Sequence, residues 1–399
     1  MPEVADVFSK YGKEYRRKYQ LPNQMMKVMK AIEDCRTAKL GGHIDECDEC
    51  GHIKISYNSC RNRHCPKCQS LAKERWLTDR KNDLLPVEYF HVVFTIPDTL
   101  NPLTLRNQRE LYSILFKSVS ETLLELGKDP KYLGVDIGFI GVLHTWGQNL
   151  MDHPHIHCIV AGGGLSLDSD RWIPARKGFF VPVKVLSRLF RGKFLAYLKG
   201  AYVDGRLKFC GSINGLGEKE NFGVFLDSLY KREWVVYSKP SFRKPEHVIE
   251  YLGRYTHRVA ITNNRILDIE NGKVTFNYKD YKDYKEQNKH KNKHKKMTLE
   301  ANEFIRRFML HVLPPKFVKI RHYGILSNRN RKTKLKCCKE LLGVSIEQVK
   351  EKKGWQELLL DLTGKDPMVC PCCKVGRLVR KEIFGPARSE NIGIKKLVA

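Results

Sequence analysis

The sequence predicts an α+β fold, with a central antiparallel sheet flanked by helices and preceded by a cysteine-rich N-terminal module. Three observations support this prediction. Short apolar segments alternate with helical segments, without the regular strand–helix–strand repeat that builds a parallel sheet. Two apolar segments are separated only by "NLMD" (149–152), a connection short enough for an antiparallel hairpin. Six of the 13 cysteines fall between Cys35 and Cys68.

The sequence of the first half of the core domain predicts a strand, a helix and two further strands. Residues 84–97 are rich in aromatic and β-branched side chains, which favour a strand. Residues 102–129 repeat apolar side chains at helical spacing, and those on one face are Leu111, Ile114, Leu115, Val119 and Leu123. Two further strands are predicted at 135–148 and 155–163, joined by the short connection.

The second half of the core continues with a basic helix at 183–202, a strand at 233–239 and a helix at 244–259. A hairpin follows at 264–281, because Asn271-Gly272 is a strong turn signal between two alternating segments. We therefore divide the chain into three segments. They are an N-terminal helical and zinc-binding module (1–82), a core domain (83–290) and a basic C-terminal helical region (291–399).

The charge of the chain predicts a polyanionic partner. Lys and Arg number 72 against 44 Asp and Glu, which gives a formal net charge of +28. Basic side chains bind phosphates and release counterions, so nucleic acid is the expected partner. No stretch approaches the ~20 apolar residues of a membrane span, and the N-terminus lacks a secretory apolar region. We therefore expect a cytoplasmic, nucleoid-associated protein with reduced cysteines, and clustered cysteines are then read as metal ligands.

Two cysteine knuckles predict a structural zinc site. Cys47-x2-Cys50 and Cys65-x2-Cys68 are separated by 14 residues. Each turn directs two thiolates towards one point, and two such turns complete a tetrahedral Zn²⁺ shell. The spacing predicts that these four cysteines share one zinc.

The same module contains a further set of potential ligands. Its members are Cys35, His43, Cys60 and His64. Two interpretations stay open for this set: it binds a second zinc, or it packs locally around the first zinc site. Arg61 and Arg63 are interleaved with the ligands and indicate a DNA-docking surface. Near the C-terminus, Cys370 and Cys373 form half a knuckle without a convincing second pair.

The stretch "MDHPHIHCIVAGGG" (151–164) predicts a second kind of metal site. On a strand, His155 and His157 project to the same face with Ile156 opposite. Two imidazoles side by side can chelate one divalent ion. The third ligand is either His153 or Gln148, which lies at the end of the preceding strand. Mg²⁺ or Mn²⁺ is the expected ion, and zinc stays an alternative.

The helix "VIEYLGRYTHRVA" offers a nucleophile. Tyr251 and Tyr255 are four residues apart and share one helical face, with Arg254 and Arg258 close by in sequence. A tyrosine hydroxyl can attack phosphorus and become covalently bound. The competing interpretation is an aromatic pair that packs the helix against the sheet.

Taken together, these motifs resemble the two-tyrosine HUH transposases of rolling-circle insertion sequences, the insertion sequence ninety-one family. The resemblance rests on "HIHCIVAGGG", "YLGRYTHRVAITNNR", "HTWGQNLMDHPHIHC", "YFHVVFTIP", "RHYGILSNRNRKTKL" and both cysteine segments. It implies an HUH endonuclease core, in which His155 and His157 belong to the metal site and Tyr251 and Tyr255 are paired nucleophiles. Gln148 matches the third, polar ligand only by position.

The resemblance also implies a reaction. Single-stranded DNA at the ends of a mobile element and at its target would be nicked through a 5′-phosphotyrosine intermediate. The chain would use catalytic Mg²⁺ or Mn²⁺ and structural Zn²⁺. Two alternatives stay open: a replication initiator or relaxase with the same chemistry, and a non-catalytic zinc-containing DNA-binding protein.

Overall fold

The computed structural model divides the chain into two compact units. The first unit contains residues 1–76, 257–312 and 349–399, and the second contains 77–256 and 313–348. The residues that the structure describes are 1–81, 83–176, 178, 180–242, 248, 253, 259–279, 294–344 and 353–387. The sequence predicted three consecutive segments, whereas the first unit is assembled from three separated stretches of the chain.

The second unit is built on an antiparallel sheet with the strand order β11-β4-β5-β3-β7, and β6 pairs with β5. The α+β class and the antiparallel sheet are as predicted. The strand bounds are β3 Tyr89–Thr95, β4 Val135–Trp146, β5 Asp152–Ser166, β6 Trp172–Pro174, β7 Val236–Phe242 and β11 Ile320–Gly324. The predicted hairpin is β4–β5, and β11 at its edge was not predicted.

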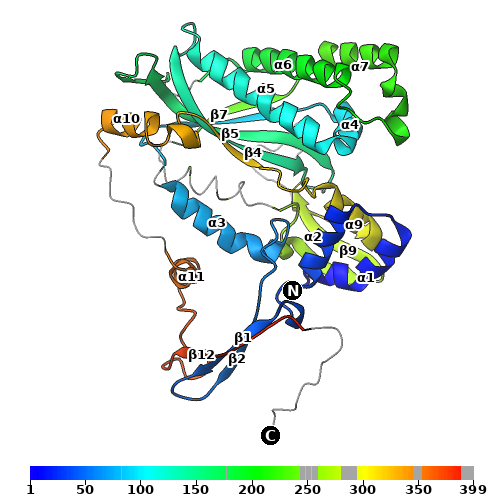
Figure 1. The fold of residues 1–399 in the computed structure, drawn as a ribbon, viewed down its shortest axis with the longest axis vertical. Coiled ribbons are helices and arrows are strands. Elements are labelled where there is room, and N and C mark those ends of the chain that lie inside the picture. Colours follow the sequence, from blue (N-terminus) through cyan, green and yellow to red (C-terminus); the bar gives the residue numbers. More distant parts are fainter. Residues whose placement is uncertain are drawn as a thin grey trace. The chain divides into compact units, whose positions relative to one another are not determined.

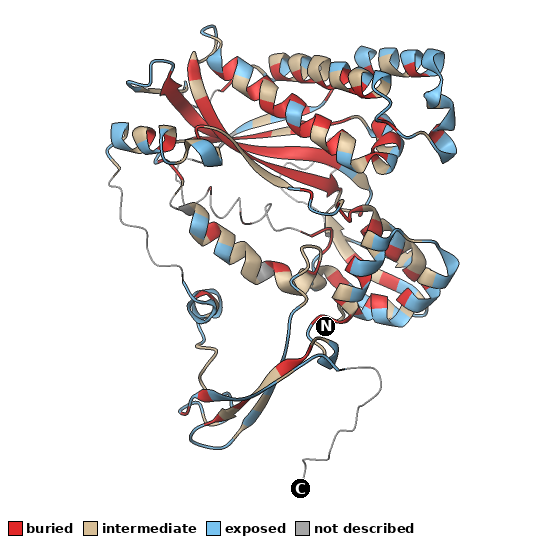
Figure 2. Ribbon diagram, in the orientation of Figure 1, coloured by how far each residue is buried: buried red, intermediate tan, exposed pale blue. Residues whose placement is uncertain are grey.

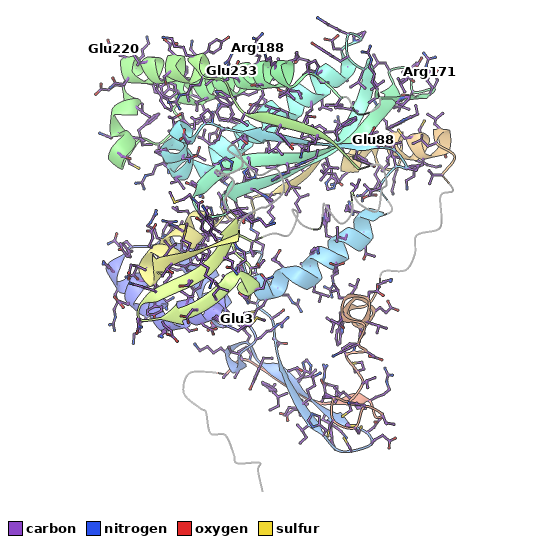
Figure 3. All side chains as sticks on the ribbon, turned by 180° about the vertical axis from the view of Figure 1, so that it is seen from behind. Glu3, Glu88, Arg171, Arg188, Glu220 and Glu233 are labelled. Carbon is purple, nitrogen blue, oxygen red and sulfur yellow. The ribbon has the colours of Figure 1, made fainter. Side chains whose placement is uncertain are left out.

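Helices cover one face of this sheet, where α5 packs on β4 and α6 on β7 (Figure 1). Their bounds and those of the neighbouring helices are α4 Asn101–Arg106, α5 Gln108–Lys128, α6 Val183–Val203, α7 Lys219–Lys231 and α10 Lys334–Leu341. Leu186 and Phe190 on α6 are buried, whereas Arg188 is on its exposed side (Figure 3). The apolar spacing of the sequence thus separates a core face from a solvent face.

Strand alternation decides what each face of the sheet carries. Ile156, Cys158 and Val160 of β5 point into the apolar core beneath the helices. His155 and His157 therefore project from the opposite face. The sheet is buried along most of its length (Figure 2), so this second face is also largely removed from solvent.

The first unit contains two small antiparallel sheets. One has the order β10-β9-β8, and the other has the order β12-β1-β2. In the β8–β9 hairpin, Asn271 and Gly272 have φ values of 48° and 75°, which confirms the predicted turn. The bounds are β1 Gly42–Cys47, β2 Ile53–Tyr57, β8 Ile266–Glu270, β9 Lys273–Lys279, β10 His294–Glu300 and β12 Leu378–Phe384.

Helices α1 and α2 form the N-terminal hairpin of this unit, and Phe8 of α1 meets Phe308 of α9 edge-to-face at 5.2 Å. The helix bounds are α1 Val4–Lys18, α2 Asn23–Glu33, α9 Ala301–Leu310 and α11 Trp355–Thr363, and α3 Pro66–Lys81 begins in this unit and ends in the second. Short 3₁₀ turns are η1 Ala38–Leu40 and η4 Asn263–Arg265 in the first unit, and η2 Asp98–Leu100, η3 Gly211–Gly217 and η6 Asn328–Asn330 in the second. None of the described helices has the length and apolar character needed to span a bilayer.

Candidate functional site

Three histidines meet on the sheet face opposite α5 and α6. The β4–β5 pairing places His144 directly across from His155, and His157 lies two residues further along β5. Each offers a ring nitrogen, and these atoms lie within 4.8 Å of one another. All three are buried, with exposed fractions of 2% for His144 and 8% for His155 and His157. Buried imidazoles that converge in this way are suited to bind a transition-type divalent cation.

Hydrogen bonds fix how two of these rings are turned. His155 donates from Nδ1 to the carbonyl oxygen of His153 at 2.6 Å. In the neutral imidazole the Nε2 atom of His155 therefore carries a lone pair. That Nε2 lies 3.0 Å from Nε2 of His157. Two nitrogens at this distance need a proton or a cation between them. The pair is therefore arranged as a ligand pair or, without a cation, as a hydrogen bond.

A fourth histidine, His91 on the neighbouring strand β3, lies on the same sheet face and contacts His157. Its Nε2 lies 2.9 Å from Nδ1 of His157, and the two rings are stacked at 5.1 Å with an interplanar angle of 9°. Burial, with a smaller contribution from the positive charge of Lys239, lowers the pKa of the His91 imidazole to about 4. His91 is therefore neutral near pH 7, and it can accept the Nδ1 proton of His157.

The third imidazole of this site, His144, differs from the third ligand that the sequence predicted. His144 was missed, and it completes the group of three imidazoles. Its signal was present, because "HTW" ends a predicted strand that faces the histidine strand. His153 is exposed at the entry of β5 and contributes its carbonyl oxygen to His155. Gln148 lies half-buried in the β4–β5 turn, and its role as a ligand stays a prediction.

Strand β7 adds an aromatic ring and a cation to the same sheet face. Val93 of β3 pairs with both His157 and Tyr237, which places Tyr237 in the row of His157. Lys239 lies in the next row, opposite His91, and its Nζ is 5.4 Å from the Tyr237 ring. Tyr237 is 43% exposed. An exposed aromatic ring and a cation thus lie on β7, two strands away from β5. Side chains of these kinds can stack on bases and contact phosphates.

The predicted nucleophiles and their basic neighbours lie outside the residues that the structure describes. They are Tyr251, Tyr255, Arg254 and Arg258. Their roles rest on the sequence.

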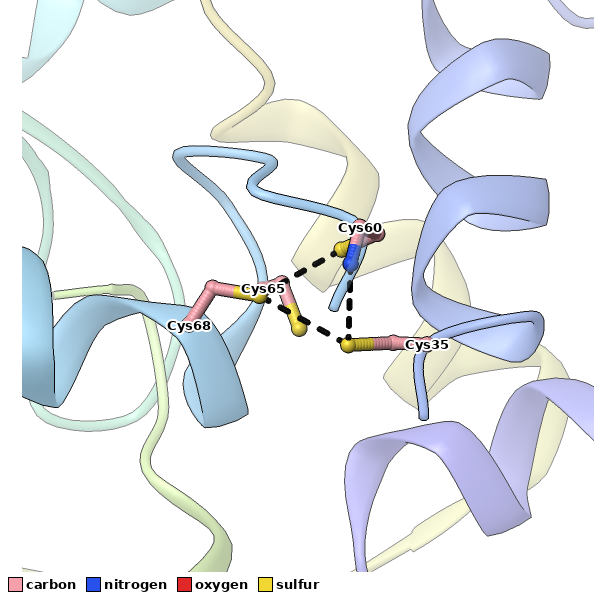
Figure 4. Close-up of side chains that lie close together, drawn as sticks. All are labelled: Cys35, Cys60, Cys65 and Cys68. Carbon is pink, nitrogen blue, oxygen red and sulfur yellow. Dashed lines mark hydrogen bonds between the residues drawn. The ribbon is translucent and has the colours of Figure 1, made fainter. Parts of the chain in front are cut away.

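In the first unit, the predicted pairing of the two cysteine knuckles is wrong. Cys65 and Cys68 meet Cys35 and Cys60 (Figure 4). Cys47 and Cys50 meet a different pair. In the first group, Sγ of Cys68 lies 3.6 Å from Sγ of Cys35 and 3.6 Å from Sγ of Cys60. A tetrahedron of sulfurs ~2.3 Å from a central zinc has edges of ~3.8 Å, so this group fits a four-thiolate site.

The partners of Cys47 and Cys50 are Cys370 and Cys373, the half-knuckle of the C-terminal region. The physical reason for the exchange is chain topology. Strand β12 follows the C-terminal knuckle and pairs with β1, which ends at Cys47. Sequence spacing favours nearby pairs and carries no information about a pairing across this distance.

The histidines proposed for a second zinc do not join the cysteines. His43 places its Nε2 3.2 Å from a carboxylate oxygen of Asp45. The backbone N–H of His64 donates to Oδ1 of Asn62 at 2.9 Å, within the loop that leads to Cys65. Among the described residues, the two groups of sulfur ligands contain cysteine alone. The set Cys35, His43, Cys60 and His64 is therefore not formed.

The two arginines of this module have different surroundings. Arg61 is exposed and has a φ of 52°. Arg63 is half-buried, and burial lowers the pKa of its guanidinium. Arg61 is the better placed of the two for a phosphate contact, and DNA binding by either stays a prediction.

Comparison with known proteins identifies the family of this chain. A family described as "Putative transposase" matches residues 138–334, and one described as "Transposase zinc-binding domain" matches residues 7–96. "Putative transposase y4qJ" of Sinorhizobium fredii (strain NBRC 101917 / NGR234) is 49% identical over 395 residues, which are 97% of this chain and 98% of that protein. The chain belongs to the transposases of the insertion sequence ninety-one family.

A second relative supports the assignment. "Transposase for insertion sequence element IS801" of Pseudomonas savastanoi pv. phaseolicola is 27% identical over 354 residues, which cover 88% of this transposase and 82% of that protein. No solved structure matches significantly. The zinc-binding match contains all of Cys35, Cys60, Cys65 and Cys68, and zinc is therefore a structural metal of this transposase. Its partner is DNA.

Proposed function

We propose that this transposase cuts and rejoins single-stranded DNA at the ends of its element through a 5′-phosphotyrosine intermediate. The observation that carries the proposal is the buried group of His144, His155 and His157, with two Nε2 atoms 3.0 Å apart. A structural protein gains little from three imidazoles on one buried sheet face, because each must be desolvated. Binding of one shared divalent cation would compensate this desolvation.

The donor set fits such a cation. Three neutral imidazole nitrogens suit manganese and softer divalent ions better than magnesium, which prefers oxygen ligands. A bound divalent ion supplies Lewis-acid polarisation of the scissile phosphate and fixes its orientation. His155 and His157 would bind it through Nε2, because their Nδ1 atoms face the carbonyl of His153 and the ring of His91.

His91 acts in this proposal as a positioning residue. Its Nε2 accepts the Nδ1 proton of His157 and thereby keeps the Nε2 lone pair of His157 directed at the shared point. Such outer hydrogen bonds fix the tautomer and the orientation of a ligand. The low pKa of His91 keeps it uncharged, so it does not repel a cation nearby.

The nucleophiles of the proposal are Tyr251 and Tyr255, as the family resemblance implies. The phenolic oxygen of one tyrosine attacks phosphorus, the bond from phosphorus to the 3′-oxygen breaks, and the phenolic proton passes to solvent. In the rejoining step a 3′-hydroxyl attacks the phosphotyrosine and releases the phenol. One phosphoester replaces another in each step, so no nucleotide triphosphate is needed.

A cleavage assay on 5′- and 3′-labelled single-stranded oligonucleotides from the element ends tests this function. The expected result is a free 3′-hydroxyl fragment and a covalent protein–DNA adduct, which peptide mapping places on Tyr251 or Tyr255. The double substitution Tyr251→Phe with Tyr255→Phe should remove the adduct and keep DNA binding. Tyr237→Phe is the matched control and should keep the adduct. Binding without any adduct in the wild-type protein would support a non-catalytic DNA-binding protein instead.

A further inference from the structure

We propose that Cys47, Cys50, Cys370 and Cys373 form a second four-thiolate zinc site, which fastens the C-terminal segment to the N-terminal zinc module. The C-terminal pair lies beyond both matched families, which end at residues 96 and 334. All four cysteines belong to the first unit. The proposal is independent of the nicking chemistry.

The sulfur geometry is that of a metal site. Sγ of Cys47 lies 3.7 Å from Sγ of Cys373, and Sγ of Cys50 lies 3.7 Å from Sγ of Cys370. All four ligand atoms lie within 4.8 Å of one another. These separations match the ~3.8 Å edges of a zinc–thiolate tetrahedron with ~2.3 Å bonds. They are far longer than the ~2.05 Å of a disulfide.

The two knuckles repeat one backbone turn, although they lie in distant parts of the chain. Gly51 donates its N–H to the carbonyl of Cys47 at 3.1 Å, and Lys374 donates to that of Cys370 at 3.0 Å. Both donors have positive φ, 69° at Gly51 and 60° at Lys374. A non-glycine residue in this region is uncommon and marks a constrained turn. The same turn built twice around C-x2-C indicates one function for both pairs.

Backbone N–H groups also point at the C-terminal sulfurs. Cys372 donates its N–H to Sγ of Cys370 at 3.4 Å, and Gly376 donates to Sγ of Cys373 at 3.3 Å. Hydrogen bonds of this type favour the charged thiolate over the thiol. A Cβ at Gly376 would lie 2.5 Å from Sγ of Cys47, so only glycine allows the two knuckles to approach this closely.

The adjoining strands hold the knuckles in register. Cys47 pairs with Leu378 where β1 meets β12, and the N–H of Arg377 donates to Oδ1 of Asp48 at 2.7 Å. The Arg380 guanidinium forms an ion pair with Asp45 in the same sheet. The C-terminal segment is therefore an integral strand and ligand pair of the zinc module. A chain shortened before Cys370 should lose this metal although every N-terminal cysteine remains.

Metal analysis of the full-length protein tests the proposal. Elemental analysis of the folded full-length protein should find two zinc ions per chain. The pair Cys370→Ser with Cys373→Ser should leave one, and Cys35→Ser with Cys60→Ser should also leave one. Cys372→Ser is the matched control, because Cys372 is exposed and belongs to neither group, and it should keep two. Unchanged zinc in the Cys370/Cys373 variant would overturn the proposal, as would a wild-type protein with one zinc.

A second measurement does not depend on whether a variant folds. The native wild-type protein is alkylated with N-ethylmaleimide, and the labelled cysteines are read by mass spectrometry before and after removal of zinc with a chelator. Cys50, Cys370 and Cys373 should resist the reagent until zinc is removed and should then react together, whereas Cys372 should react from the start. Rapid labelling of Cys370 and Cys373 in the zinc-loaded protein would contradict the proposal and restore a single site built from N-terminal cysteines.

Discussion

The histidine site of the second unit and the cysteine sites of the first unit assemble their ligands over very different lengths of chain. His144, His155 and His157 lie on one hairpin, so two adjacent strands supply all three. The cysteine groups close across 33 residues in one case and 326 in the other. The first arrangement follows from the alternation of a strand. The second requires the fold to be known, because each turn supplies only two ligands and the remaining pair can come from anywhere.

A substitution at the histidines is the most direct test of this comparison. His157→Ala should lower the nicking rate by at least about a thousandfold, because polarisation of the phosphate contributes several kcal/mol and each ~1.4 kcal/mol is tenfold in rate. Binding of single-stranded DNA should change less than about threefold, since dispersed basic residues carry it. Rates from single-turnover assays in manganese and affinities from fluorescence anisotropy measure the two effects.

His153→Ala is the matched control for that substitution. The hydrogen bond from His155 to His153 uses the backbone carbonyl of His153, which any residue provides, and the residue is exposed. The rate should stay within about threefold of the wild type, well inside the tenfold that ~1.4 kcal/mol represents. If His153→Ala and His157→Ala were equally damaging, the assignment of ligands on β5 would be wrong.

The sequence predicted most of the core because its signals are local. The strands β3, β4, β5 and β7 follow from runs of apolar and β-branched side chains, and the β8–β9 turn follows from Asn271-Gly272. The edge strand β11 was missed because "IRHYG" is polar and only half-buried, so it lacks an apolar face. Strand β10 was missed because lysines precede its two apolar residues, Met297 and Leu299, so the alternation of apolar and polar residues is short. In the structure these two residues pair with Phe276 and Val274.

The sites divide in the same way. His155 and His157 could be predicted because a spacing of two on a strand places both on one face. His144 could not be fixed by counting, since the hairpin has an irregularity between His144 and Trp146 that shifts the pairing. The ligand groups of the cysteines were predicted wrongly because no local rule connects Cys370 with Cys47. Only the β1–β12 pairing brings them together.

The second prediction concerns the first unit. Cys35→Ser with Cys60→Ser should remove one zinc and unfold the region around it, because a structural zinc contributes on the order of 10 kcal/mol to the folding of small zinc domains. Hydrogen exchange should show lost protection in α2 and the loop before α3. The sheet of the second unit should keep its protection, since it has its own core.

Cys337→Ser is the control for this pair, because Cys337 lies outside both groups of sulfur ligands. It should keep both the zinc content and the exchange pattern. Loss of protection in the second unit together with the first would mean that the two units do not fold separately, and the comparison between them would fail.

The third prediction separates the observed third imidazole from the predicted amide. His144→Ala should reduce nicking by roughly a hundredfold and weaken manganese binding, because it removes one of three buried nitrogen ligands. Gln148→Ala should change the rate by less than about fivefold, which corresponds to roughly 1 kcal/mol. Titration of activity with manganese gives the affinity for each variant, and the reverse order of effects would favour Gln148 as the ligand.

The fourth prediction concerns His91. His91→Ala should raise the manganese concentration for half-maximal activity by about 10- to 100-fold, which is the usual effect of removing a hydrogen bond to a ligand. Saturating manganese should restore most of the rate, because His91 holds a ligand and does not contact substrate. His91→Asn should lose less than His91→Ala, since an amide oxygen can accept the Nδ1 proton of His157. A rate that saturating metal does not restore would give His91 a part in the reaction itself.

The smallest expected effect lies at Tyr237, and it tests whether the sheet face beyond the histidines contacts DNA. Stacking of one base on an aromatic ring contributes about 1–3 kcal/mol, so Tyr237→Ala should weaken binding of single-stranded DNA by roughly 5- to 150-fold. The ring is 43% exposed, so its loss leaves the core intact. It lies in the same row of the sheet as His157. Tyr237→Phe keeps the stacking surface and should bind within about twofold of wild type, since π-stacking does not need the hydroxyl. Equal binding by the alanine and phenylalanine variants would place the DNA away from β7. Loss of the covalent adduct in Tyr237→Phe would instead identify Tyr237 as a nucleophile, because this substitution removes only the phenolic hydroxyl.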